Sequence, residues 1–161
     1  MTAHQNSRKA HQAYERCNQS MMPGGTPIGE LDLSPVEFSF LNAARFFFAS
    51  FAEPNSQSWL SVVLSSEDFF PQGDSPLIVK NVLTMVHELR TSRKSVLRFS
   101  SPRCIDCSAI LTAEERHIIM MLKELQRGSH SSASTHAMLL CEGNETGGLL
   151  KASETLLANL S

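Results

Sequence analysis

Residues 34–54 read SPVEFSFLNAARFFFASFAEP, and this stretch decides the fold class. It begins with a serine, a proline and a glutamate in the capping-box pattern that is typical of a helix N-terminus. Leu41, Arg45 and Phe48 recur at helical spacing, and further phenylalanines add apolar surface to the other faces. Pro54 marks the end of the helix. Because a helix that is apolar nearly all round is normally buried, we expect this one at the centre of the core.

Apolar residues also recur at helical spacing outside this segment. They predict helices over residues 56–64, 75–90, 112–127, 131–142 and 145–160. Thr112 and Glu115 form a second capping box, and residues 95–99 fit a short extended segment. The sequence therefore predicts a mainly α fold, a compact orthogonal bundle of five to seven short helices with little or no strand.

Length and composition indicate one globular domain. The chain has 161 residues, of which 42% are apolar and 19% are charged, enough to bury a core without disulfide or metal support. Proline and glycine interrupt residues 21–33, MMPGGTPIGELDL, which makes a helix unfavourable there. We predict a polar N-terminal segment with a Pro/Gly-rich linker over residues 1–30 and a single helical domain over residues 31–161.

The charge balance and the N-terminal residues narrow the class of protein. The net charge is −2 with neutral histidines, which argues against a strongly basic nucleic-acid-binding protein. The N-terminal residues lack the apolar core of a secretory signal, and the most apolar run is too short for a membrane span. We therefore expect a cytoplasmic protein without a membrane partner.

Residues 90–107, RTSRKSVLRFSSPRCIDC, concentrate positive charge. Five of the fourteen lysines and arginines lie here, with no acidic residue before Asp106. Such a cluster either faces a partner or forms a solvated loop paired with nearby acids. We expect a protein as the partner and regard nucleic acid as the less favoured one. The candidate partner-binding residues are Arg90, Arg93, Lys94, Arg98 and Arg103.

The same stretch ends in a CxxC pair, Cys104 and Cys107, which allows three interpretations. Two thiolates at this spacing can chelate one zinc ion. A CxxC pair before a helix can also act as a reactive thiol, although the βαβ setting of thioredoxin-like enzymes is missing. Alternatively, the cysteines are small buried apolar residues. These three interpretations stay open.

A structural zinc site needs two more ligands. Cys141 is the natural third, and the fourth is His117, with His87, His136 and Cys17 as alternatives. His136 and Cys141 are five residues apart, about 140° around a helix, so they do not share a face. The predicted metal site therefore consists of Cys104, Cys107, Cys141 and His117.

Other catalytic motifs are missing from the sequence: it contains no phosphate-binding loop, no HExxH and no GxSxG. We therefore expect a non-enzymatic intracellular interaction or regulatory protein with a basic partner-binding face and, on one interpretation, structural zinc. The alternative is a small thiol- or metal-dependent enzyme that uses Cys104 or Cys107. The apolar excess is also compatible with a homodimer.

Overall fold

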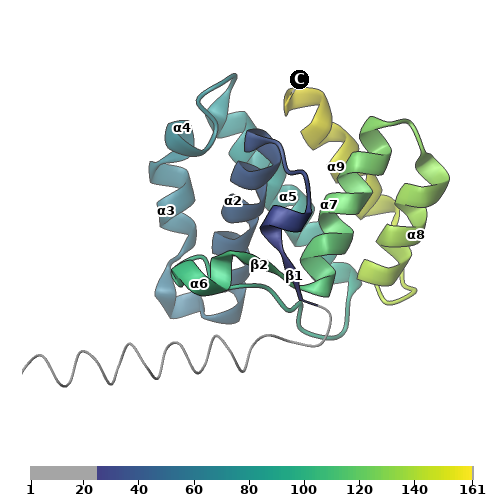
Figure 1. The fold of residues 1–161 in the computed structure, drawn as a ribbon, viewed down its shortest axis with the longest axis horizontal. Coiled ribbons are helices and arrows are strands. Elements are labelled where there is room, and N and C mark those ends of the chain that lie inside the picture. The colour runs from purple at the N-terminus through teal and green to yellow at the C-terminus, as the bar shows by residue number, and fades with distance from the viewer. Residues whose placement is uncertain (1–24, 161) are drawn as a thin grey trace, which may run out of the picture.

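The structure, a computed structural model of the chain, describes residues 25–160 (Figure 1). The α-helices are α2 (Pro35–Ala52), α3 (Trp59–Leu64), α4 (Ser66–Phe69), α5 (Ser75–Ser92), α6 (Ile105–Ser108), α7 (Ala113–Gln126), α8 (His130–Leu140) and α9 (Gly147–Leu160). Two short strands, β1 (Thr26–Pro27) and β2 (Ile110–Leu111), and two 3₁₀ turns, Ile28–Glu30 and Pro54–Ser56, complete this part of the chain. The polar segment predicted before residue 25, which includes Cys17, lies outside the described residues.

The prediction of a mainly α fold is confirmed. Six of the α-helices between residues 25 and 160 have six or more residues, whereas α4 and α6 are single turns of four. Among the described residues, strand structure is limited to the two-residue pair β1–β2. None of these helices is long and apolar enough to cross a membrane.

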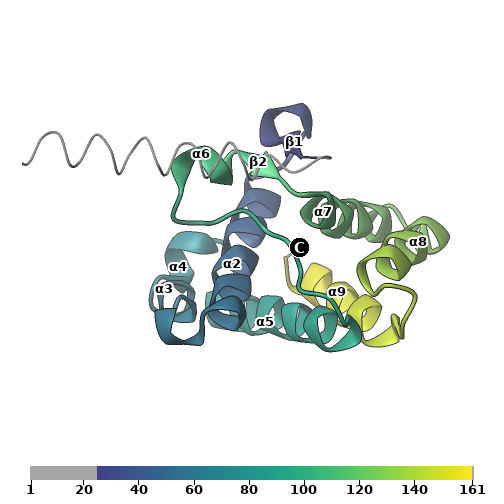
Figure 2. The same cartoon turned by 90° about the horizontal axis from the view of Figure 1, so that it is seen from below.

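Helix α5 joins the two halves of the helical domain. In Figure 1, α2, α3 and α4 lie on one side, and α7, α8 and α9 lie on the other. Helix α5 packs against α2 on the first side and against α9 on the second (Figure 2). The core is built from fully buried side chains of six helices, α2, α3, α5, α7, α8 and α9, among them Phe40, Phe47, Met85, Ile118 and Leu156.

Helix α2 forms where the sequence predicts it, for local reasons. Ser34 accepts a hydrogen bond from the Glu37 amide, and the Glu37 carboxylate accepts one from the Ser34 amide, which completes the capping box. The burial of α2 is not uniform, because Phe38 and Phe51, near its two ends, stay about 40% exposed. The central turns of α2 therefore supply the core, and its C-terminal end reaches the surface.

Strand β1 lies in the segment that the sequence assigns to the linker. Thr26 pairs with Leu111 and Pro27 with Ile110 in an antiparallel register, and the Ile28 amide donates to the Ala109 carbonyl. Ile28 and Leu31 then pack against the core. A two-residue strand leaves no periodic signal in the sequence, so this pairing could not be predicted.

Candidate functional site

A buried ion pair between α2 and α7 fixes the basic segment to the helical domain. Arg45 and Glu115 are both fully buried, and the guanidinium donates two hydrogen bonds to the carboxylate, from Nε at 2.7 Å and from Nη2 at 3.0 Å. The same guanidinium donates to the carbonyls of Ser108 and Ile110. Because every charged group here is paired and hydrogen-bonded, burial of the pair is tolerated.

The carboxylate of Glu115 also organises the chain before α7. Its oxygens accept hydrogen bonds from the Ser100 and Thr112 amides. The Thr112 hydroxyl donates to the Arg98 carbonyl, and the Ser100 hydroxyl donates to the Ile110 carbonyl. These bonds hold residues 98–112 against α2 and α7, although this interval contains only one helical turn, α6.

An apolar groove lies between the C-terminal end of α2, the C-terminal end of α5 and the segment after α5. It has a volume of about 400 Å³. Aromatic and aliphatic side chains dominate its lining, three cations join them, and none of the lining residues is acidic. The lining residues are Phe48, Phe51, Ala52, Leu89, Arg90, Arg93, Lys94, Ser95, Val96, Leu97 and Phe99.

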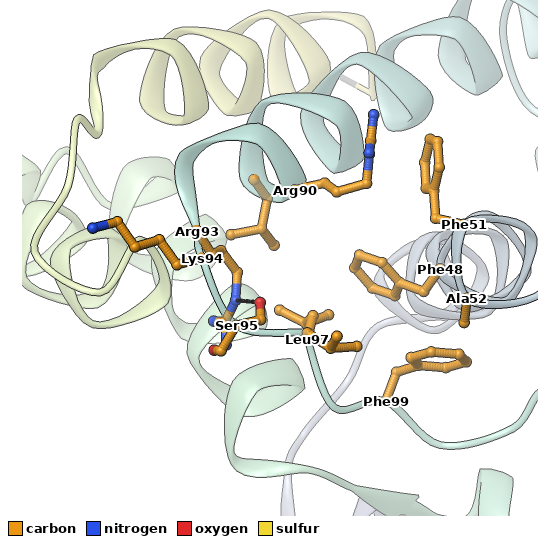
Figure 3. A pocket seen from close by; sticks show the side chains of 11 residues that line it. Phe48, Phe51, Ala52, Arg90, Arg93, Lys94, Ser95, Leu97 and Phe99 are labelled. Carbon is orange, nitrogen blue, oxygen red and sulfur yellow. Dashed lines mark hydrogen bonds between the residues drawn. The ribbon is translucent and has the colours of Figure 1, made fainter.

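Aromatic rings form one wall of this groove (Figure 3). The rings of Phe48 and Phe99 lie 5.7 Å apart between centroids, in a tilted arrangement. The guanidinium carbon of Arg90 lies 4.3 Å from the centroid of the Phe51 ring, within the range of a cation–π contact. Lys94 also borders the groove, and its side chain extends away from the rings.

Arg93 has a different role from Arg90 and Lys94, the other two cations that line the groove. Its side chain is only 6% exposed and donates to the carbonyl of Leu140, at the end of α8, and to the carbonyl of Ser95. Glu142 lies 3.4 Å away. Hydrogen bonds from the Ser95 side chain and amide lower the pKa of Glu142, and the charge of Arg93 adds to this effect. Arg93 thus anchors the segment, with its charge compensated.

The five predicted partner-binding residues do not all lie at the groove. Arg90, Arg93 and Lys94 line the groove. Arg98 forms an ion pair of 2.8 Å with Glu114, as expected for a basic residue of a solvated loop. Arg103 is exposed just before α6 and does not line the groove. The sequence indicated the basic cluster. Two of the three rings in the groove, Phe48 and Phe51, come from α2, some forty residues earlier, where the sequence indicated only packing.

The four predicted zinc ligands lie in different environments. Cys104 is a free, half-buried thiol that caps α6 and accepts a hydrogen bond from the Cys107 amide at 3.3 Å. Cys107 is disulfide-bonded. Cys141 is a fully buried free thiol at the end of α8, and the Ser92 hydroxyl donates to its sulfur at 3.0 Å. Within residues 25–160, no three cysteine, histidine, aspartate or glutamate side chains gather to hold one metal ion.

His117, the predicted fourth ligand, instead contacts His136. The Nδ1 atoms of the two imidazoles lie 3.0 Å apart, and the ring centroids lie 5.2 Å apart. Partial burial lowers the pKa of His117, and the positive charges of His136 and Arg116 lower it further, against a smaller opposing effect of Glu114. From the sequence, His117 is the expected fourth zinc ligand and His136 is one of its alternatives. Their contact leaves no signal in the sequence, because the two histidines belong to different helices.

Comparison of the chain with protein-family models, with curated proteins and with solved structures finds no match.

Proposed function

We propose that this protein is an interaction module that binds an acidic peptide segment with apolar side chains. The observation that carries the proposal is the groove at the ends of α2 and α5, where an apolar lining with an aromatic wall is bordered by cations and contains no acidic residue. Apolar pockets with a few well-placed polar groups are the usual form of a binding site.

The apolar part of the groove supports the proposal because several of its side chains remain uncovered. Val96 is 81% exposed and Phe51 is 39% exposed, whereas Leu97 is partly buried against the core. Exposed apolar residues that line one groove are typical of surfaces that a partner covers. Apolar side chains of a bound peptide would cover Val96 and the exposed part of Phe51.

The charges define the partner's chemistry. Neither Arg90 nor Lys94 forms an ion pair with any of residues 25–160, whereas the charge of Arg93 is compensated by Glu142. A guanidinium that lies over an aromatic ring keeps its outward N–H groups available for a carboxylate. Asp or Glu in the partner would therefore sit at the mouth of the groove, beside Arg90.

A peptide fits these observations better than a nucleic acid does. Affinity for nucleic acid depends on many phosphate contacts, and only two of the cations that line the groove are uncompensated. The partly apolar lining would be poorly matched to a sugar–phosphate backbone. It is well matched to a peptide whose apolar and acidic residues alternate.

The groove is also held in shape before any partner binds. Arg93 and Ser95 connect one end of residues 93–99 to the end of α8, and Thr112 and Glu115 hold the residues at the other end. A preformed site avoids part of the entropy cost of ordering a loop on binding. This arrangement favours a specific binding site over a loose surface loop.

The test is a direct binding measurement. The probe is a short fluorescein-labelled peptide in which Asp or Glu alternates with Leu and Phe, and its fluorescence anisotropy is followed as the protein is added. We expect saturable binding that is weakened at least about tenfold by Arg90→Glu with Lys94→Glu, since reversal of charges beside a bound carboxylate introduces repulsion.

Two matched controls make the measurement specific. A peptide with Asn and Gln in place of the acids retains the apolar contacts and should bind more weakly to the unmodified protein. The variant Lys80→Glu with Lys151→Glu makes the same change in net charge at exposed residues outside the groove and should bind normally. If both charge-reversal variants lost peptide binding equally, the cause would be the change in net charge, and the proposal would be contradicted.

The other sequence-based expectations stay predictions. They are the structural zinc site on Cys104, Cys107, Cys141 and His117, the cytoplasmic location, the homodimer and the alternative of thiol or metal chemistry at Cys104 or Cys107. If a second copy of the chain occupied the groove, Arg90→Glu with Lys94→Glu would change the sedimentation behaviour of the protein without any added peptide.

A further inference from the structure

We propose that His117 and His136 form a binding site for a late first-row divalent transition-metal ion, which would link α7 to α8. This inference is independent of the proposed peptide groove. It also differs from the predicted zinc site, because it requires none of the cysteines. The observation that carries it is the approach of two imidazole Nδ1 atoms, one from each helix, to 3.0 Å.

The positions of the two histidines are determined by the packing of α7 against α8. His117 lies in the first half of α7, and His136 lies in the second half of α8. The helices are joined by a tight connection in which Gly128, with φ of 76°, ends α7 and Ser129 leads directly into α8. Such a left-handed residue after a helix favours glycine. The two helices pack side by side (Figure 2), so the imidazoles are brought together by the backbone.

The distance between the two nitrogens suits a shared metal ion. Zinc–imidazole bonds are about 2.0–2.1 Å long, so two nitrogens on one ion at an angle between about 90° and 110° lie about 2.9–3.4 Å apart. The observed 3.0 Å is within this range. A small rotation of the two rings would direct both lone pairs at one point, and because both side chains are only partly buried, water can occupy the remaining positions.

The protonation states are compatible with metal binding at neutral pH. In the present contact, one Nδ1 carries the proton and donates to the other, so both rings can be neutral. Binding of an ion moves that proton to Nε2 of the same ring, so two neutral histidines bind the ion without a net change in protons.

The charged residues next to the histidine pair have opposite effects on the binding of a cation. Glu114 precedes His117 by one helical turn, and its Oε2 atom is buried with no hydrogen-bond partner among the described residues. This carboxylate favours a cation at the pair, whereas the neighbouring Arg116 opposes one. The site has two imidazole ligands, and water would fill the other coordination positions. Its affinity for metal ions should follow the general order of divalent ions, with copper bound more tightly than nickel or zinc.

The experiment uses zinc chloride and the full chain with ¹⁵N-labelled histidine. Zinc does not oxidise the free thiols, and the ring ¹⁵N resonances distinguish Nδ1 from Nε2. We expect about one equivalent of zinc to shift the Nδ1 resonances of His117 and His136 together while both Nε2 atoms become protonated. Because this readout uses the unmodified chain, it does not depend on the folding of a variant.

Substitutions then identify the ligands. His117→Gln and His136→Gln should each reduce the affinity measured by zinc titration at least about tenfold, the lower end of the range for loss of a group that supports a bound metal. The matched control is His87→Gln, because His87 is an exposed histidine on α5, and it should leave the affinity unchanged. The proposal is overturned if the two Nδ1 resonances do not move at millimolar zinc, or if both substituted proteins bind zinc as the unmodified chain does.

Discussion

Arg45 and Arg90 are the same kind of side chain in opposite environments. Arg45 is fully buried between α2 and α7, and it donates four hydrogen bonds to a carboxylate and two carbonyls. Arg90 is exposed at the end of α5, has no ion pair with residues 25–160 and lies over the ring of Phe51. Every interaction of the first is satisfied inside the molecule, whereas the second keeps its hydrogen-bonding capacity for the outside.

Because of this difference in environment, Arg45 contributes to the stability of the fold, whereas Arg90 is available for binding. Removal of a buried, paired charge leaves its partner unpaired at low dielectric, which is costly. Removal of an exposed cation changes the field at the surface and little else. We therefore expect substitutions at the Arg45–Glu115 pair to affect folding, and substitutions at Arg90 to affect partners.

The largest effect is expected for Arg45→Met. The side-chain volume is largely kept, but Glu115 remains buried without its partner, which should lower the free energy of unfolding by about 3–5 kcal/mol. Urea denaturation followed by circular dichroism measures this change. The double variant Arg45→Met with Glu115→Leu removes the unpaired carboxylate and should be more stable than Arg45→Met alone. A loss below about 1 kcal/mol for Arg45→Met would show that the pair does not hold the fold.

A smaller effect is expected for Arg98→Met, which removes the ion pair with Glu114. The Arg98 side chain is 50% exposed, so water and salt screen the interaction, and the loss should be no more than about 1 kcal/mol. The same urea experiment compares the two arginines directly. If Arg98→Met were as destabilising as Arg45→Met, burial would not be the property that distinguishes them.

Arg90→Ala should alter stability still less, by about 0.5 kcal/mol, the value of an exposed cation–π contact. In contrast, we expect it to weaken binding of the acidic peptide, because Arg90 is the cation beside the aromatic wall. Anisotropy and urea denaturation of the same preparation report both quantities. A marked loss of stability without a change in binding would reverse the roles that we assign to the two regions.

The smallest expected effect is a change in pH dependence at His117. Its pKa in the folded protein lies below the ordinary value of 6.5, so between these two values the unfolded chain binds more protons than the folded one. The unfolding free energy should therefore fall as the pH is lowered from 6.5 through the folded-state pKa. His117→Gln should flatten this slope. An unchanged slope would indicate that other groups cause it.

The sequence predicts those features that depend on neighbouring residues. The capping boxes Ser34–Glu37 and Thr112–Glu115 require only three-residue spacing, and both form as expected. The helical repeat also predicts that His136 and Cys141 have different surroundings, and they do, since His136 contacts α7 and Cys141 contacts Ser92.

Features that depend on distant residues could not be predicted in this way. Arg45 and Glu115 are seventy residues apart, and in the sequence the position of Glu115 is explained by capping alone. The one available signal was Arg45, the only charged residue of α2 after its first turn. The groove combines rings of α2 with cations of α5 and the following segment, and the proximity of these elements is decided by tertiary packing.

The most direct test of the proposed role of the groove is a map of amide NMR shifts on addition of the unlabelled acidic–apolar peptide. We predict that the shifts concentrate at the ends of α2 and α5 and over residues 93–99, with Phe51, Arg90 and Leu97 among the most affected. They should stay small around the buried pair Arg45–Glu115. Absence of shifts at saturating peptide, or shifts on a different face of the molecule, would contradict the account.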